Sequence, residues 1–276
     1  MDTNRIKSIK ITGLFDQFNV DWEVHPDVNI LVGINGIGKS TILRCINALL
    51  SNEYVYLKKL NVEISAVFQD GLQIAFPAPK GKTEKPHPDV NLEYMSTFDI
   101  PLKNKKSIGQ TETPLDKELQ RVIYTLGTGQ KSFSNYRFKA TNYPQSAKKI
   151  NTDIRGLFDL IDRLFAETGK KIEINPEDNA LIFRYKEFII PLEKLSSGEK
   201  QLLTILFTVF LMEKEPYIIM MDEPEISLHI GWQQQLIDVI RQLNPDCQLI
   251  IATHSPSIFG EGWGDKLVFV EDLMQS

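Results

Sequence analysis

The chain has 276 residues, of which 42% are hydrophobic and 24% are charged. This composition excludes a disordered, collagen-like or low-complexity chain, and the length predicts one large domain over 1–276, built as a core with an elaborate insertion. Thirty-one Lys and Arg against 36 Asp and Glu give a net charge of −5, which excludes a bulk nucleic-acid coat and leaves only local polyanion binding.

The first third of the chain is predicted to form short strands and one helix. Strands are expected over 6–11, 20–24 and 28–32. The last of these is nearly all apolar, which is typical of a strand buried on both faces. A glycine-rich turn and a helix over about 39–50 follow it. A hairpin is then expected from strands over 64–68 and 72–76, with Asp70 and Gly71 supplying positive φ angles in the turn.

The rest of the chain changes pattern twice. Residues 77–89 and 101–114 are rich in Pro, Lys and Gly and are expected to be mobile loops, whereas 147–165 has the apolar spacing of a long amphipathic helix. Short antiparallel strands are predicted at 171–174, 180–184 and 188–190. Helices over 198–212 and 231–243 then alternate with strands over 217–221, 248–252 and 266–270, which is typical of a layered α/β sheet.

Cysteine usage and hydropathy indicate the compartment. Cys45 and Cys247 lie far apart without metal-ligand spacing, which argues against a disulfide framework or a zinc site and favours a reducing compartment. The longest apolar stretch, over 202–212, is too short to cross a bilayer. Residues 1–10 lack the pattern of a signal peptide. We therefore expect a cytoplasmic protein without a membrane segment.

Residues 33–40 fit the phosphate-loop pattern of Gly, four residues, Gly-Lys-Ser, between a buried strand and a helix. Glycines allow backbone N–H groups to surround phosphates, and the helix N-terminus adds positive potential. Lys39 would contact the β and γ phosphates, and the Ser40 hydroxyl would bind Mg²⁺. The expected nucleotide contacts are Asn35, Gly36, Ile37, Gly38, Lys39, Ser40 and Thr41.

A pair of carboxylates, Asp222 and Glu223, follows the apolar run over 217–221. Carboxylates at the exit of a buried strand complete a nucleotide site when a phosphate loop is present. Asp222 would hold Mg²⁺, and Glu223 would act as the base that polarises the attacking water.

Residues 195–201, Leu-Ser-Ser-Gly-Glu-Lys-Gln, open the apolar helix over 198–212. Ser196 and Glu199 fit the S-x-x-E capping box, which is a structural role. The same helix N-terminus is an anion site that could bind a γ-phosphate held by a partner subunit. Both roles remain open on these residues alone.

These segments together resemble the ABC-type ATPases. Residues 195–201 resemble their signature motif, so that Ser196, Ser197, Gly198 and Glu199 are implied as nucleotide contacts. Residues 222–229, Asp-Glu-Pro-Glu-Ile-Ser-Leu-His, are similar to the Walker B and D-loop segment of the SMC, RecF and OLD branch. His254, in Thr-His-Ser-Pro after a buried strand, is similar to the switch histidine, although a lone histidine there is more often structural.

The resemblance implies an α/β fold: an ABC ATPase head with a mixed central sheet, an N-terminal antiparallel strand lobe and a helical insertion at about 77–194. It implies ATP and Mg²⁺ as ligands, with Lys39, Glu223 and His254 as catalytic residues. It also implies a homodimer or higher oligomer in which each site joins one subunit's phosphate loop to the other's signature helix. The Q-loop glutamine, Gln69 or Gln145, and the adenine-stacking ring, Phe15 or Phe18, stay unassigned.

Compact proteins with this motif set resemble ATPases of bacterial anti-phage systems such as Septu, PARIS and retron modules, which work with a separate effector. Too few residues follow Val270 for the Toprim nuclease of OLD proteins, so a nuclease or toxin is expected to be another chain. A RecF-like repair or chromosome ATPase and the ATPase subunit of a membrane transporter are the alternatives.

Nucleic acid is a possible partner through two lysine-containing loops. The lysines are Lys80, Lys82, Lys85, Lys103, Lys105 and Lys106. Acidic residues in the same loops offset this charge, and no aromatic residues that could stack on bases lie between the lysines of either loop. A solvated loop is therefore the favoured interpretation.

Overall fold

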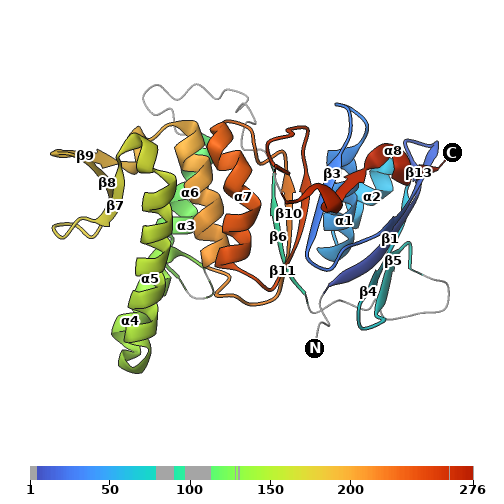
Figure 1. The fold of residues 1–276 in the computed structure, drawn as a ribbon. Coiled ribbons are helices and arrows are strands. Elements are labelled where there is room, and N and C mark those ends of the chain that lie inside the picture. The colour runs from blue at the N-terminus through green and yellow to red at the C-terminus, as the bar shows by residue number, and fades with distance from the viewer. Residues whose placement is uncertain are drawn as a thin grey trace, which may run out of the picture.

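Residues 5–78, 90–96, 113–127, 129, 131–260 and 262–275 are described by a computed structural model. Their strands form three sheets, and Figure 1 shows these with the helices in layers. The lysines at 80–85 and 103–106 lie outside the described residues.

A parallel sheet occupies the middle of the molecule. Its strand order is β12 (Leu267–Phe269), β3 (Val28–Val32), β11 (Cys247–Ala252), β10 (Tyr217–Asp222), β6 (Asn91–Met95). Every residue of β3, β10 and β11 is buried, as expected for parallel strands covered on both faces. Asp222 pairs with Ala252, and Ala252 pairs with Leu31, so these three strands end at the same edge.

An antiparallel sheet covers one side of the molecule. It runs β13 (Met274–Gln275), β2 (Phe18–Glu23), β1 (Ile6–Leu14), β4 (Glu63–Phe68), β5 (Gln73–Phe76). Helix α1 (Lys39–Leu50) lies between this sheet and the parallel sheet, beside the short helices α2 (Tyr54–Leu60) and α8 (Val270–Leu273) (Figure 1). Its apolar face joins one core with Ile218, Met220 and Ile250 of the parallel sheet.

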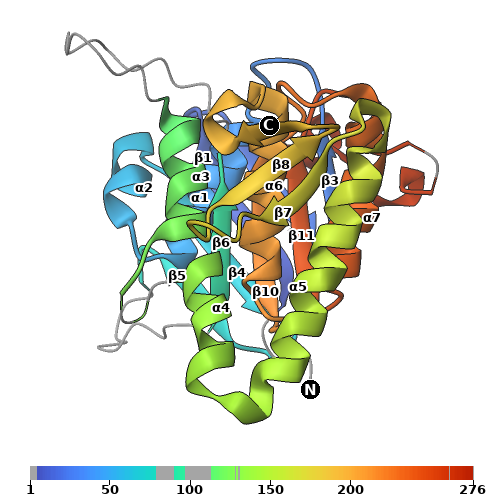
Figure 2. The same ribbon diagram turned by 90° about the vertical axis from the view of Figure 1, so that its left-hand side faces the viewer.

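Helices cover the other face of the parallel sheet. They are α3 (Pro114–Tyr124), α4 (Phe133–Asn142), α5 (Pro144–Leu164), α6 (Ser197–Phe210) and α7 (Ile230–Leu243). A third, antiparallel sheet of β7 (Lys171–Ile174), β8 (Leu181–Tyr185) and β9 (Phe188–Pro191) completes this side, which faces the viewer in Figure 2. Short 3-10 helices lie at Ala166–Thr168, Leu192–Lys194 and Gly264–Lys266. In the core the Phe133 and Phe207 rings meet edge to face at 5.0 Å.

The predicted α/β fold, with its antiparallel strand lobe and helices between the phosphate loop and the signature segment, is confirmed. The expected mixed central sheet is parallel throughout its described pairings, and the antiparallel strands form two separate sheets. In the hairpin turn Gly71 takes a φ of 86°, while Asp70 stays outside the positive-φ region, which corrects the expectation for that pair.

Several elements were not predicted. They are α2, β6, α3, α4, α8 and β13. Helix α3 begins at a capping box, in which Thr113 accepts from the Asp116 backbone N–H and Asp116 accepts from that of Thr113, directly after a stretch expected to be loop. No helix in the described ranges has both the length and the hydropathy needed to span a membrane.

Candidate functional site

The phosphate loop connects the carboxyl end of β3 to the N-terminus of α1. Gly36 and Gly38 take φ angles of 84° and 113°, which favour glycine. A Cβ on Gly38 would also lie 3.0 Å from the Phe15 ring. Lys39 is 5% exposed, and its ammonium donates to the Gly33 carbonyl at 2.8 Å and to the Ile34 carbonyl at 3.3 Å. The loop therefore folds around the lysine that the sequence assigned to phosphate.

Ser40 and Asp222 come together from opposite ends of the chain. The Ser40 hydroxyl donates to Asp222 Oδ1 at 2.7 Å. Asp222 is 3% exposed, and this burial raises the pKa of its carboxyl, although the hydrogen bond from Ser40 and the charges of Arg44 and Lys39 act in the opposite direction. A hydroxyl beside a carboxylate supplies the oxygen ligands that Mg²⁺ prefers, so these residues fit the predicted metal site.

Glu223 and His254 also meet at this edge. The Glu223 backbone takes a φ of 51°, and its N–H donates to the Ala252 carbonyl at 2.8 Å. His254 Nδ1 lies 3.4 Å from Glu223 Oε1 and 3.3 Å from Glu225 Oε1. The structure thus brings the predicted base and the predicted switch histidine together on neighbouring strand ends.

Glu225 is a site residue that sequence reasoning did not assign. It is 5% exposed, and its Oε1 accepts from the Thr253 hydroxyl and, at 3.1 Å, from the His254 backbone N–H. Its Oε2 is buried without a hydrogen-bond partner among the described residues. Glu225 therefore positions the histidine segment. The Glu-Pro-Glu motif was visible in the sequence, but the burial of its second carboxylate was not.

Gln233 on α7 is a second positioning residue that was missed. Its Oε1 accepts from the Ser255 hydroxyl at 2.8 Å, and its Nε2 donates to the Leu228 carbonyl at 2.9 Å. One amide thus joins the segment after His254 to the segment after Glu225. No local pattern distinguishes it from the adjacent Gln234 and Gln235.

The signature segment forms the predicted capping box at the start of α6. The Ser196 hydroxyl accepts from the Glu199 backbone N–H at 3.3 Å, and Glu199 Oε2 accepts from the Ser196 N–H at 2.9 Å. Lys170 donates to the other Glu199 oxygen. Burial acts to raise the pKa of Glu199, but the Lys170 ammonium and the Ser196 N–H outweigh it and hold the pKa below its ordinary value.

Gly198 has a packing reason to be glycine. A Cβ at this position would lie 2.2 Å from the backbone oxygen of Ser227. Gln201, one turn later, donates to the Pro224 carbonyl at 2.8 Å. The start of α6 is therefore seated directly on the backbone of residues 224–227.

The signature helix and the phosphate loop belong to opposite sides of the parallel sheet. Helix α6 lies on the helical face, and α1 lies on the face toward the antiparallel sheet (Figure 1). Their buried side chains belong to two different cores. Ser196 and Ser197 are exposed. Hence the N-terminus of α6 faces solvent rather than the phosphate loop of its own chain.

The structure also places the two candidate adenine-stacking rings and the two candidate Q-loop glutamines. Phe15 is 48% exposed and lies beside Gly38, whereas Phe18 packs against the core. Gln69 lies in the turn between β4 and β5, and Gln145 lies in the first turn of α5.

The close approach at Gly198 predicts an intolerance to any side chain. Gly198→Ala should lower the free energy of unfolding by about 1–3 kcal/mol, because the methyl group overlaps the Ser227 carbonyl. Gly156→Ala on α5 is the matched control, since nothing lies within 4 Å of its Cβ position. This variant should raise the free energy of unfolding by at most about 1 kcal/mol. Urea unfolding of both variants measures this. Equal free energies of unfolding for the two variants would contradict the close contact between Gly198 and Ser227.

The charge of Glu199 predicts a pH dependence. Its pKa is lowered on folding, so its carboxylate stabilises the folded state above its ordinary pKa of 4.5, and this stabilisation is lost as pH falls through the lowered folded value. Glu199→Gln keeps the capping geometry. It should destabilise the protein at pH 7 and lose that effect in acid, measured by urea midpoints from pH 7 downward. The exposed Glu187→Gln serves as the control, and a pH-independent difference for Glu199→Gln would refute the assignment.

Known proteins are similar to this chain. Residues 28–260, most of the chain, match the family described as "AAA domain, putative AbiEii toxin, Type IV TA system". The chain is 24% identical to the Septu protein PtuA of Bacillus thuringiensis, over 91% of this chain and 72% of that protein. It is 27% identical to the phosphate import ATP-binding protein PstB 3 of Natronomonas pharaonis, over 83% of this chain.

The chain spans only 62% of the length of that phosphate import protein. Its fold resembles an SMC head bound to the C-terminal winged-helix domain of ScpA, with a TM-score of 0.55 at 15% identity, covering 92% of this chain and 90% of that one. The fold is therefore that of an ABC ATPase head, and the resemblance to ATPases of anti-phage systems such as Septu is confirmed. The chain belongs to the AAA-domain family that matches residues 28–260.

Proposed function

We propose that this chain hydrolyses ATP to ADP and phosphate with Mg²⁺, and that two copies enclose two ATP molecules. The observation that carries the chemistry is the meeting of Lys39, Ser40, Asp222, Glu223 and His254 at one edge of the parallel sheet. A cation, a hydroxyl–carboxylate pair and a carboxylate beside an imidazole are the groups that phosphoryl transfer to water requires.

Each group has a distinct role. The backbone N–H groups of 35–38 and the start of α1, with Thr41, would bind the phosphates, and Lys39 would neutralise the β and γ oxygens. Ser40 and Asp222 would hold Mg²⁺, which when bound supplies charge neutralisation between those oxygens. Glu223 accepts a proton from the water whose oxygen attacks the γ-phosphorus, as the bond to the ADP oxygen breaks. His254 contacts the γ-phosphate.

The second half of each site comes from another copy. Ser196 and Ser197 are exposed at the N-terminus of α6, next to the buried Gly198 and Glu199, and α6 lies on the other side of the parallel sheet from α1. A helix N-terminus attracts anions, so in a dimer it would bind the γ-phosphate held by the partner copy. ATP would then stabilise the dimer, and hydrolysis would release it.

We further infer that the ATPase cycle regulates a separate effector, a nuclease or toxin, in cytoplasmic anti-phage defence. Similarity to the Septu protein PtuA over 91% of the chain supports this. In this account 1–276 is one ATPase domain and the region at about 77–194, with α3 to α5 and β7 to β9, is the family-specific insertion.

Two other functions have support. Similarity to a phosphate import ATP-binding protein favours the ATPase subunit of a transporter, and the SMC-head fold is compatible with a RecF-like chromosome ATPase. Stimulation of hydrolysis by DNA ends would favour the repair function. Co-purification with an integral membrane protein would favour transport.

Glu223→Gln should slow phosphate release by about 10²–10⁴-fold while retaining ATP, because the general base is lost. The variant should therefore accumulate as a dimer in ATP and Mg²⁺, measured by size exclusion with light scattering. Lys39→Ala should stay monomeric because it binds ATP weakly. Glu187→Gln, an exposed change of equal charge, should behave as the unaltered protein. The proposal fails if Glu223→Gln turns over normally or never dimerises with ATP.

A further inference from the structure

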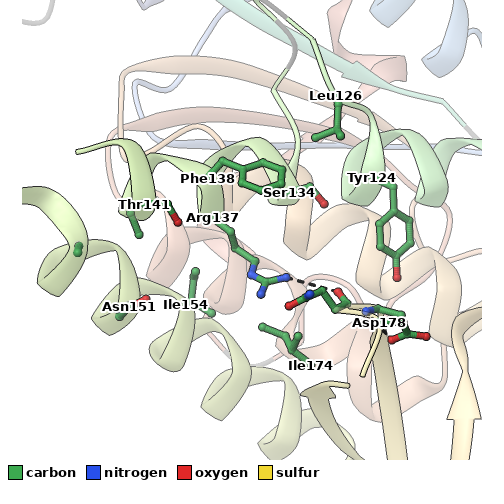
Figure 3. A pocket seen from close by; sticks show the side chains of 14 residues that line it. Tyr124, Leu126, Ser134, Arg137, Phe138, Thr141, Asn151, Ile154, Ile174 and Asp178 are labelled. Atoms are coloured by element: carbon green, nitrogen blue, oxygen red, sulfur yellow. Dashed lines mark hydrogen bonds between the residues drawn. The ribbon is translucent and has the colours of Figure 1, made fainter. Parts of the chain in front are cut away.

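A second cavity lies in the helical part of the chain, apart from the phosphate site (Figure 3). It has a volume of about 770 Å³ and is bounded by α4, α5, the end of α3 and the turn between β7 and β8. This volume lies within the range of sites that bind small molecules or peptide side chains. None of the residues that line it belongs to the nucleotide site.

The walls of this cavity combine polar and apolar side chains, and some of the apolar ones reach the surface. Ile154 of α5 and Ile174 of β7 form part of the lining. At the mouth Phe138 is 51% exposed and Leu126 is 61% exposed. Large apolar side chains that remain exposed around a hollow are typical of a surface that binds another molecule.

Arg137 of α4 supplies one charged group in this lining. Figure 3 shows its side chain directed between α4 and the β7–β8 turn. Within the described ranges, its guanidinium makes one hydrogen bond, to the Asn179 carbonyl at 3.5 Å, and lies 5.9 Å from the Phe133 ring of its own helix. A guanidinium has five N–H donors, so most of them are unused.

Among the described residues, no carboxylate forms an ion pair with Arg137. Burial lowers the pKa of Arg137 below its ordinary value, the direction expected for a cation that is desolvated without a carboxylate. The other charged lining residue, Asp178, is exposed and uses Oδ1 to accept from the Ala180 N–H at 2.9 Å. A carboxylate that entered beside Arg137 would gain charge-assisted hydrogen bonds that the folded chain does not already provide.

Nucleic acid fits this cavity poorly. Arg137 is the sole Lys or Arg among the described lining residues, and Asp178 offsets its charge. Binding of a phosphate backbone requires several cations along a track. One guanidinium beside a few large apolar side chains instead matches one carboxylate next to one apolar group.

We propose that this cavity is a docking site for a second protein, which inserts an Asp or Glu side chain onto Arg137 with an adjacent apolar side chain between Phe138, Leu126 and Ile154. The carboxylate forms paired hydrogen bonds with the guanidinium, and the apolar side chain displaces water from the walls. This inference is independent of ATP hydrolysis and stands or falls separately from it.

The test uses two libraries of blocked hexapeptides, with randomised residues around either Glu–apolar or Gln–apolar at the centre. The Glu library should be enriched on the purified full chain. The best Glu peptide should bind at least tenfold more tightly than its Gln counterpart, measured by calorimetry. Arg137→Gln should reduce that affinity at least tenfold, whereas Arg155→Gln, an exposed change of equal charge on α5 outside the lining, should not.

A second variant covers the case in which Arg137→Gln disturbs folding. Phe138 is largely exposed, so Phe138→Ser should fold normally and still weaken the Glu peptide. Equal binding of Glu and Gln peptides, no binding by either library, or binding that survives Arg137→Gln would overturn the proposal. Binding of a labelled single-stranded oligonucleotide that is lost in Arg137→Gln but kept in Arg155→Gln would reassign the cavity to nucleic acid.

Discussion

The hydrogen bond from Ser40 to Asp222 joins two residues that are 182 positions apart, and the rest of the site depends on it. It forms because β3 and β10 are both buried strands of one parallel sheet, and the carboxyl ends of such strands meet at a single edge. Most side chains within β3, β10 and β11 are apolar, and the hydroxyl, the carboxylates and the imidazole lie at that edge. A buried Asp222 with a raised pKa is a cost of folding that a bound cation would offset.

Around this edge, hydrogen bonds and one close backbone contact join the segments that carry the site residues. Glu225 binds the backbone of His254, Gln233 joins the segments on either side, and Gly198 rests on the Ser227 carbonyl. These contacts connect the signature helix, the residues after β10 and the histidine segment within one chain. Movement of one of them therefore requires the others to shift. Lys170, directly before β7, extends the connection by its ion pair with Glu199.

The nucleotide-binding half of the site could be predicted from sequence because its residues are local. The phosphate loop is a strand, a turn and a helix in direct succession, and the Asp222-Glu223 pair follows an unbroken apolar run. Glu225 and Gln233 could not be predicted, because their roles depend on burial and on partners about 20 to 30 residues away. Helices α3 and α4 were missed for a related reason: polar residues dominate their exposed faces, and their few apolar residues are buried by elements distant in the sequence, such as α6.

The central claim is that each ATP site is shared between two copies, and a mixing experiment tests it most directly. Lys39→Ala removes the phosphate-binding half, and Ser197→Arg blocks the exposed signature half without entering the core. Each variant alone should be inactive. An equal mixture should recover activity, to at most about half of the unaltered ATPase rate, because a dimer of one copy of each variant holds one complete site of two. Full activity of Ser197→Arg alone, or no recovery on mixing two folded variants, would contradict a shared site.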